Sequence, residues 1–262
     1  MRQHASESST WPRSLWLVRH GESAGNVARD QAMTSGAEVI DIAMRDVDVP
    51  LSDRGRAQAT ALARWTQRRD EDDRPTIVLT SPYLRAVETA TPIAATIEVP
   101  HSPTPIIDER LREKEFGALD RLTRAGIMAR FPAEIAMRER LGKFYYRPPS
   151  GESWCDVVQR LRGVMLELQH NYAREHVAIV AHQVIVLCFR YLLEQLDEQK
   201  ILAIDRLGDV ANGSVTAYRF DPSAHHGRGG LVLQAYNSTE ALEHEGVPVT
   251  AEPAAQPDPK AR

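Results

Sequence analysis

The residues of this chain that are best suited to chemistry are two histidines and two arginines, which stand at or just beyond the ends of three short apolar runs. Arg19 and His20 follow the run 14–18, Arg85 lies shortly beyond the run 77–80, and His182 follows the run 177–181. An imidazole can attack phosphorus as a nucleophile, and a guanidinium can hold two phosphate oxygens with its planar fork of donors. These residue types and positions therefore predict a cationic site that binds and attacks a phosphoryl group.

The elements that must position these residues are buried strands. Each of the three apolar runs has the length and composition of such a strand, and helical patterns alternate with them, most clearly at 52–67 and 153–170. Since ligands of open α/β sheets bind at the carboxyl ends of the strands, we expect the four side chains at one edge. The alternation predicts an α/β fold, a three-layer α/β/α sandwich with a mainly parallel sheet. The runs 213–220 and 230–236 are expected to extend that sheet at one side.

Phosphoryl transfer also needs an acid that protonates the leaving oxygen, and the segment 111–117 offers carboxylates just before an aromatic-glycine turn. Glu113 and Glu115 lie in this segment, while Glu109 and Glu22 are alternatives. A carboxyl group that burial or neighbouring charge keeps protonated can act as this acid. The residue types alone leave the choice among the four glutamates open.

Five short motifs occur in an order that resembles the histidine phosphatase superfamily, whose fold is the phosphoglycerate-mutase-like sandwich. The first, Arg19-His20-Gly21-Glu22-Ser23 with Asn26, is similar to the RHG motif that opens members of this superfamily. The others are Ser81-Pro82 with Arg85-Ala86, Leu111-Arg112-Glu113 with Phe116-Gly117, Gly151-Glu152-Ser153, and Ala181-His182. The RHG motif alone is a weak signal, but the ordered set over residues 13–222 is specific.

This resemblance implies a metal-independent enzyme that uses no cofactor and forms a phosphohistidine on His20. It also favours Glu113 over Glu109 as the proton donor. The phosphate-binding residues that it implies are Arg19, Asn26, Arg85 and His182, and Ser23 is expected among the substrate-binding residues. The sequence itself has no HExxH motif and no closely spaced cysteine pair that would indicate a metal site.

Two insertions, at residues 27–50 and 118–149, are expected to shape the mouth of the site, because such segments usually carry substrate choice. The second insertion is most similar, within the superfamily, to the bisphosphatase domain of fructose-2,6-bisphosphatase. This similarity would place Arg138, Lys143 and Gln183 on a second phosphate or another polar end of the substrate.

The similarity to that bisphosphatase domain is incomplete. Trp154, Leu187 and Arg124 stand where the bisphosphatase domain has a tyrosine, an arginine and a tyrosine. The expected function is therefore hydrolysis of a small phosphorylated metabolite. The alternatives are a sugar bisphosphatase, a mutase-type phosphotransferase and, least favoured because every catalytic position is filled, a catalytically silent binding protein.

Length and composition place these motifs in one domain. In a chain of 262 residues we expect the domain at 13–248, between disordered segments at 1–12 and 249–262. The net charge of −4 gives no reason to expect nucleic acid or an anionic membrane as a partner, so the expected partner is the small phosphorylated substrate. No secretory leader or membrane span is evident, and a cytoplasmic location is expected.

Overall fold

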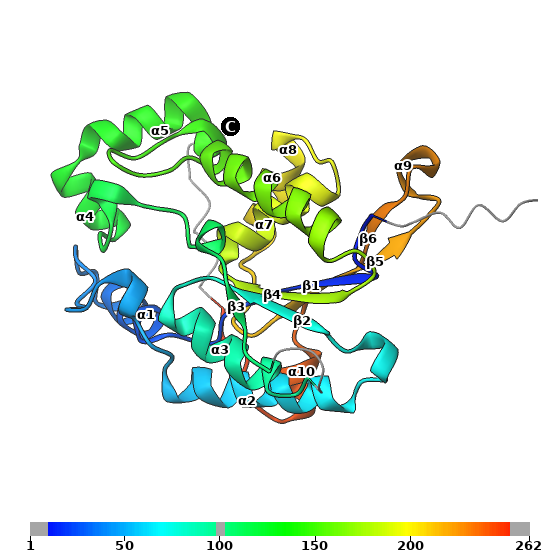
Figure 1. Cartoon of the computed structure of the whole chain (residues 1–262). Coiled ribbons are helices and arrows are strands. Elements are labelled where there is room, and N and C mark those ends of the chain that lie inside the picture. Colours follow the sequence, from blue (N-terminus) through cyan, green and yellow to red (C-terminus); the bar gives the residue numbers. More distant parts are fainter. Residues whose placement is uncertain (1–9, 98–102, 252–262) are drawn as a thin grey trace, which may run out of the picture.

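The computed structural model describes residues 10–97 and 103–251 and has a six-stranded sheet at its centre (Figure 1). The strands are β1 (Ser14–Arg19), β2 (Ile77–Thr80), β3 (Ile106–Ile107), β4 (His176–Ala181), β5 (Val215–Asp221) and β6 (Gly230–Ser238). Their order across the sheet is β3-β2-β4-β1-β5-β6. The first four of these are mutually parallel, whereas β5 is antiparallel to β1 and to β6.

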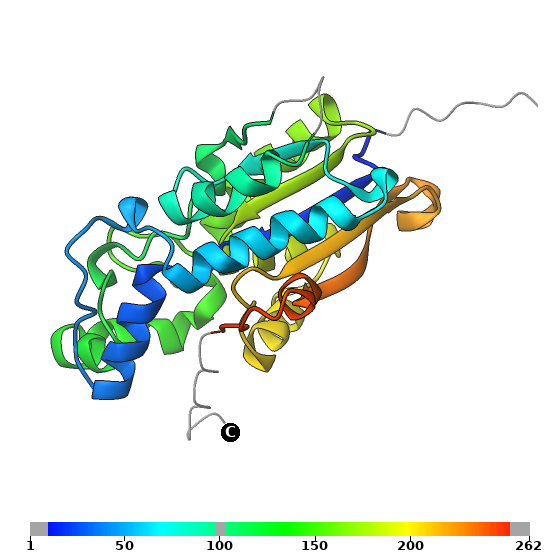
Figure 2. The same cartoon turned by 90° about the horizontal axis from the view of Figure 1, so that it is seen from below.

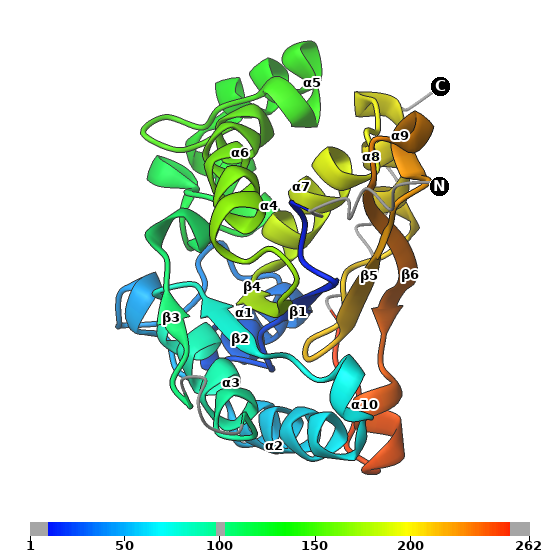
Figure 3. The ribbon, with the colours of Figure 1, turned by 45° about the vertical axis from the view of Figure 1, so that its right-hand side comes forward.

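Helices cover both faces of the sheet and complete a three-layer sandwich (Figures 1 and 3). They are α1 (Ala24–Ser35), α2 (Asp53–Arg68), α3 (Leu84–Ala94), α4 (Arg124–Arg130), α5 (Pro132–Tyr145), α6 (Trp154–Asn171), α7 (Gln183–Leu193), α8 (Glu198–Leu207), α9 (Ala224–Gly227) and α10 (Glu240–His244). One face carries α2, α3 and α10, and the other carries α6 and α7. Serine residues cap α2 and α6, because the hydroxyls of Ser52 and Ser153 accept backbone hydrogen bonds in the first turn.

The core consists of two clusters of buried residues, one on each side of the sheet. Alternate residues of β1 point to opposite sides, so that Leu15 and Leu17 pack with α6 and α7 while Trp16 and Val18 pack with α2 and α3. Burial on both faces explains why β1 and β4 are continuous apolar runs rather than alternating patterns.

The predicted α/β/α sandwich with a mainly parallel sheet is confirmed. The runs 213–220 and 230–236 do extend the sheet, as β5 and β6. They return as an antiparallel pair, so the sheet is mixed, with its parallel part formed by the strands that lead into the candidate site.

The two insertions pack against each other beyond the carboxyl end of β1, where α1, α4 and α5 gather (Figures 1 and 2). The backbone N–H of Thr123 donates to the carbonyl of Glu38 at 3.0 Å, and its hydroxyl donates to the carbonyl of Ala37 at 2.7 Å. Arg130 forms an ion pair with Glu38 at 3.3 Å. The segments predicted at 27–50 and 118–149 thus form one continuous cap on this end of the sheet.

Most of the predicted terminal segments, 1–12 and 249–262, lies outside the described residues. The part that is described near the C-terminus is joined to the domain. Thr250 accepts a backbone hydrogen bond from Asn212 at 2.8 Å, and its hydroxyl accepts one from the Gln58 amide at 3.1 Å. Within the described part of the chain, every helix is too short or too polar to cross a lipid bilayer.

Candidate active site

The parallel strands bring the two predicted histidines and two predicted arginines together at their carboxyl ends. Arg19 is the last residue of β1, and His20 follows it and donates its backbone N–H to the carbonyl of Ala181, the last residue of β4, at 2.9 Å. His182 directly follows β4, and the centre of its imidazole ring lies 5.1 Å from that of His20. Arg85 lies in the first turn of α3. All four residues are at least nine-tenths buried.

The ring of His20 is oriented by the backbone of its neighbour. Its Nδ1 lies 2.7 Å from the carbonyl oxygen of Gly21, which can only accept, so Nδ1 carries the proton and Nε2 bears the free lone pair. Burial, followed by the charges of Arg85 and Arg19, lowers the pKa of His20 well below its usual value. The imidazole is therefore neutral at pH 7, the state in which it can act as a nucleophile.

The loop after His20 is held rigidly against the start of α2. The Glu22 carboxylate accepts hydrogen bonds from Ser52 at 2.6 Å and Arg54 at 3.0 Å, which commits this glutamate to a structural role. A β-carbon added to Gly55 would lie 1.9 Å from the Glu22 carbonyl oxygen, so only glycine permits this close approach. These contacts fix the backbone from which His20 projects.

His182 presents one ring nitrogen to the site. Its Nε2 lies 2.8 Å from the hydroxyl oxygen of Ser81, and that oxygen also accepts the backbone N–H of Tyr83 at 3.3 Å. The Ser81 hydroxyl can thus donate to Nε2, which places the proton of the neutral ring on Nδ1. This Nδ1 is buried without a hydrogen-bond partner among the described residues and lies 4.0 Å from Glu113 Oε2. It is a donor available to a phosphate oxygen.

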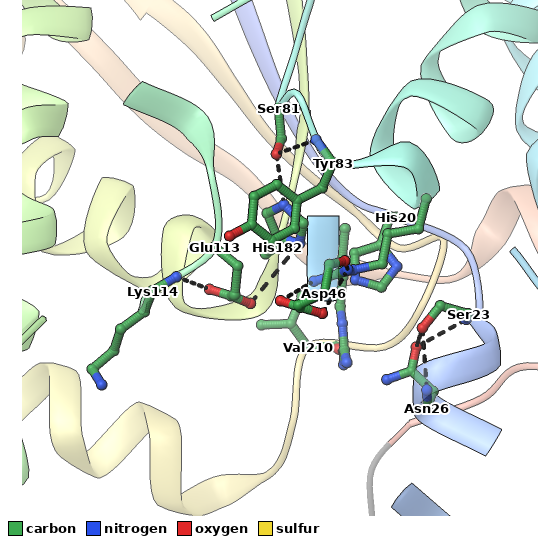
Figure 4. Close-up of polar contacts among 12 residues, drawn as sticks. His20, Ser23, Asn26, Asp46, Ser81, Tyr83, Glu113, Lys114, His182 and Val210 are labelled. Atoms are coloured by element: carbon green, nitrogen blue, oxygen red, sulfur yellow. Dashed lines mark hydrogen bonds and ion pairs between the residues drawn. The ribbon is translucent and has the colours of Figure 1, made fainter. Parts of the chain in front are cut away.

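Glu113 is the glutamate that faces this cluster (Figure 4). Its side chain is 15% exposed, and burial raises the pKa of its carboxyl group to about 7. A substantial fraction of the group is therefore protonated at neutral pH. Glu109 and Glu115 are exposed, and Glu115 accepts the hydroxyl of Tyr83 instead.

An ion-pair network holds the backbone around Glu113. The carboxylate of Glu152 accepts hydrogen bonds from Arg112 at 2.8 Å and from Arg160 at 3.0 Å. Arg160 also donates to the Glu113 carbonyl at 3.2 Å. The glutamate of the Gly-Glu-Ser motif thus helps to position the segment that carries Glu113.

The guanidinium of Arg85 is already paired with a carboxylate. Asp46 lies in the first insertion, and its carboxylate accepts two hydrogen bonds from the guanidinium, at 2.9 and 3.2 Å. The backbone carbonyl of Asp46 accepts a third hydrogen bond from Arg85 at 2.7 Å. Figure 4 shows this carboxylate between Glu113 and His20. A carboxylate therefore uses the same fork of donors that a phosphate would use. Arg19, in contrast, donates to the backbone carbonyl of Val210.

Ser23 and Asn26 form the capping box of α1. The Ser23 hydroxyl accepts the Asn26 backbone N–H at 3.1 Å, and the Asn26 side-chain oxygen accepts the Ser23 backbone N–H at 2.9 Å. The amide of Asn212 donates to the carbonyl of His20 at 3.1 Å and approaches Asn26 at 3.4 Å. Both residues lie close to the loop that follows His20, and their predicted binding roles stay predictions.

The three residues predicted from the second insertion and from α7 differ in how they are engaged. The ammonium of Lys143 is paired with Asp205 at 2.5 and 2.8 Å, and the amide of Gln183 donates to Asp209 at 2.7 Å. Arg138 is exposed on α5. The structure thus brings His20, Arg19, Arg85, His182 and Glu113 together, whereas Lys143 and Gln183 are held by aspartates of their own.

Four residues of this region were missed at the level of sequence: Asp46, Ser81, Lys114 and Asn212. Ser81 lies in a recognised motif, so a search for a hydrogen-bond partner of His182 would have found it. Asn212 stands in an Asn-Gly-Ser turn, which is a weak local signal. Lys114 directly follows Glu113 within the segment 111–117, whereas Asp46 has no sequence signal, because its place depends on how the insertion folds.

Comparison with known proteins gives a consistent result. The family model of the histidine phosphatase superfamily (branch 1) matches residues 15–228. The 6-phosphofructo-2-kinase/fructose-2,6-bisphosphatase of Gallus gallus is 34% identical over 189 residues, which are 72% of this chain and 34% of that protein. The human 6-phosphofructo-2-kinase/fructose-2,6-bisphosphatase 4 is 33% identical over the same shares of the two chains. The chain spans about a third of the length of these two relatives.

Solved structures agree with these sequence relatives. The structure of mycobacterial glucosyl-3-phosphoglycerate phosphatase in complex with VO3 has a TM-score of 0.64 and is 26% identical, covering 87% of this chain and 100% of that one. The alpha-ribazole phosphatase of Shigella flexneri has a TM-score of 0.66 at 21% identity, over 86% of this chain and 96% of that one, which shows a shared fold.

Proposed function

Because the chain belongs to the histidine phosphatase superfamily, we propose that it hydrolyses a small phosphorylated metabolite through a phosphohistidine on His20, with Glu113 as the proton donor. The observation that carries this proposal is the orientation of His20. Its Nδ1–H is bound to the Gly21 carbonyl, so the lone pair on Nε2 is the one available for attack. Burial keeps the ring neutral beside two arginines that can bind phosphate oxygens.

In the first step, Nε2 of His20 attacks phosphorus while the bond from phosphorus to the leaving oxygen breaks. Glu113, protonated, gives its proton to that oxygen, and the alcohol departs. The guanidiniums of Arg19 and Arg85 and the Nδ1–H of His182 stabilise the negative charge on the phosphoryl oxygens in transit. For this step Arg85 exchanges the Asp46 carboxylate for phosphate oxygens.

In the second step, water attacks the phosphohistidine. Glu113, now a carboxylate, accepts a proton from that water, and the bond from phosphorus to Nε2 breaks. Inorganic phosphate leaves, and both His20 and Glu113 return to their starting protonation states. The pKa of about 7 suits Glu113 to both roles, since neither form is costly to reach at neutral pH.

The test is His20→Ala, with His244→Ala as the matched control because His244 is exposed on α10. A panel of phosphate esters in the presence of EDTA should release phosphate with the wild-type protein and the control. His20→Ala should abolish turnover and also the acid-labile, base-stable phosphoenzyme that wild type forms with radiolabelled substrate. Undiminished hydrolysis by His20→Ala would refute the assignment.

A sugar bisphosphatase activity is the second candidate. It is supported by the similarity to 6-phosphofructo-2-kinase/fructose-2,6-bisphosphatase over 72% of the chain. Against it, Lys143 and Gln183, which would hold the second phosphate, are occupied by Asp205 and Asp209. Including fructose 2,6-bisphosphate in the ester panel decides between the general and the specific activity.

A further inference from the structure

The peptide unit that orients the His20 ring is itself held by a buried glutamine that the steps above do not use. The carbonyl of Gly21, which accepts the Nδ1–H of His20, belongs to the same peptide unit as the backbone N–H of Glu22. That N–H donates to the side-chain oxygen of Gln58, on α2, at 2.8 Å. Because a peptide unit is planar, a hydrogen bond at its N–H also fixes the direction of its carbonyl. Gln58 thus acts on the proton of His20 through one peptide unit.

The preceding peptide unit, between His20 and Gly21, is held in the same way. The carbonyl of His20 accepts a hydrogen bond from the side-chain amide of Asn212 at 3.1 Å. The backbone N–H of Gly21 donates to the hydroxyl of Thr89 at 3.0 Å. Gln58, Asn212 and Thr89 are each at most 2% exposed, so the loss of one of these hydrogen bonds would leave a buried peptide group unpaired, which is costly. The direction of both peptide units therefore depends on three buried side chains.

One hydroxyl, that of Thr250, orients the two amides. It accepts a hydrogen bond from the amide nitrogen of Gln58 at 3.1 Å and donates one to the side-chain oxygen of Asn212 at 3.3 Å. The carbonyl of Pro248 accepts a second hydrogen bond from the Gln58 amide at 3.0 Å. The carbonyl of Thr250 accepts the backbone N–H of Asn212 at 2.8 Å. With one end of each amide bound here, Gln58 turns its oxygen and Asn212 its nitrogen toward the loop after His20.

Building on the proposed function, we propose that Gln58 and Thr250 are positioning residues for the nucleophile. Gln58 keeps the Gly21 carbonyl directed at Nδ1 of His20, and Thr250 keeps the amide of Gln58 in the orientation that this requires. The neutral ring then carries its proton on Nδ1. In the other tautomer, Nε2 carries the proton and has no lone pair free to attack phosphorus. The segment that follows α10 thereby supports the reactivity of His20.

Gln58→Met tests this link, because methionine keeps the length of the side chain but cannot replace the hydrogen bonds of the amide. The rate constant for phosphoenzyme formation, measured by rapid quench with radiolabelled substrate, should fall about 5- to 30-fold, the effect of one lost hydrogen bond at a buried group. KM and the inhibition constant of inorganic phosphate should change less than about threefold, since the phosphate-binding side chains stay in place. A wild-type rate constant, or a loss confined to phosphate binding, overturns the inference.

Thr250→Val removes only a hydroxyl from a half-buried side chain, and it tests the same link if Gln58→Met does not fold. The rate constant should fall about two- to tenfold, while Thr250→Ser, which keeps the hydroxyl, should retain the wild-type rate. Thr66→Val is the matched control, because the Thr66 hydroxyl is also buried on α2 but donates to the carbonyl of Leu62. This control should lower stability without slowing phosphoenzyme formation. Equal losses of rate in Thr250→Val and Thr250→Ser, or in Gln58→Met and Thr66→Val, would show a purely structural role and overturn the inference.

The tautomer itself can be measured without turnover. In nitrogen NMR spectra of protein labelled at histidine, the signals of His20 are those that His20→Ala lacks. Wild type should show the proton on Nδ1, and Gln58→Met and Thr250→Val should show a share of the Nε2–H form. The same tautomer in all three proteins overturns the inference, whether or not the chain is a phosphatase. Hydrolysis that survives in His20→Ala refutes the proposed function and leaves the tautomer measurement unaffected.

Discussion

At the scale of single residues, one physical cause prepares both partners of the proposed reaction. Burial disfavours the charged form of any group, so it lowers the pKa of His20 and raises that of Glu113. The imidazole of His20 is then neutral, as a nucleophile must be, and a substantial fraction of Glu113 keeps its proton near pH 7. Both states are the ones that the first step of phosphoryl transfer requires.

Glu113→Gln should separate the acid role from simple binding. The amide keeps the shape of the side chain but has no proton to give, so alkyl phosphates, whose leaving oxygen is a poor leaving group, should lose about 10²- to 10⁴-fold in kcat. The loss on p-nitrophenyl phosphate should be much smaller, because its leaving oxygen needs little protonation.

Steady-state rates on the two ester types check this expectation, with Glu109→Gln as a control at an exposed glutamate. Equal losses on both types would show that Glu113 binds substrate rather than protonating it.

At the scale of elements, the first insertion reaches into the site and occupies Arg85. Asp46 lies in a short 3-10 turn (Asp46–Asp48) that follows α1, and its carboxylate takes the fork of donors that phosphate needs. In the proposed reaction, a phosphate group therefore competes with this carboxylate for Arg85. The half-exposed carboxylate, 45% exposed, can leave without opening the core.

Asp46→Asn should strengthen the binding of every phosphate ester, including p-nitrophenyl phosphate. A half-exposed ion pair is worth about 1 kcal/mol, so we expect KM, and the inhibition constant of inorganic phosphate, to fall about fivefold. Asp48→Asn is the matched control, since Asp48 belongs to the same turn but pairs with Arg45. If Asp46→Asn weakens phosphate binding instead, the carboxylate supports Arg85 rather than competing with the ligand.

The sequence predicted the parts of the site that belong to regular elements. Arg19 ends β1, His20 and His182 directly follow β1 and β4, and Arg85 lies in the first turn of α3. Apolar runs and motif order were therefore enough to place them at one edge. Asp46 was not predicted, because it lies in a turn of a long insertion, where no sequence periodicity indicates the position of a residue.

The second insertion shows the same limit. It forms α4 and α5, and the pairing of Lys143 with Asp205 is a contact over 62 residues between α5 and α8. Such a contact depends on how the two helices pack, and packing cannot be deduced from the pattern of either helix alone.

At the scale of the whole molecule, the buried carboxyl group of Glu113 should lower the free energy of unfolding. The pKa of Glu113 is raised from 4.5 to about 7, so its contribution to stability is fully present below pH 4.5 and is lost as the pH rises through 7. Glu113→Gln should therefore raise the free energy of unfolding at pH 8.5 by about 1 to 3 kcal/mol more than at pH 5.

Denaturant unfolding of both proteins at the two pH values measures this difference. An equal effect of the substitution at both pH values would contradict a raised pKa in the folded state. Together with the loss of activity, a gain in stability would show that the fold gives up stability to keep this acid buried.

The pairing of β1 with β4 has a consequence for when the chain becomes active as it folds. Ser14 and His176 are 162 residues apart in the sequence but are paired across these two strands, with the Ser14 hydroxyl oxygen 2.8 Å from His176 Nδ1. The site forms where the same two strands end. Closing so long a loop is entropically costly and slow compared with local folding. A chain that is still being synthesised cannot assemble the two histidines until residue 182 is available, whatever its helices have already formed. Catalysis should therefore be among the last properties to arise during refolding, and the onset of hydrolysis should mark the closure of the sheet.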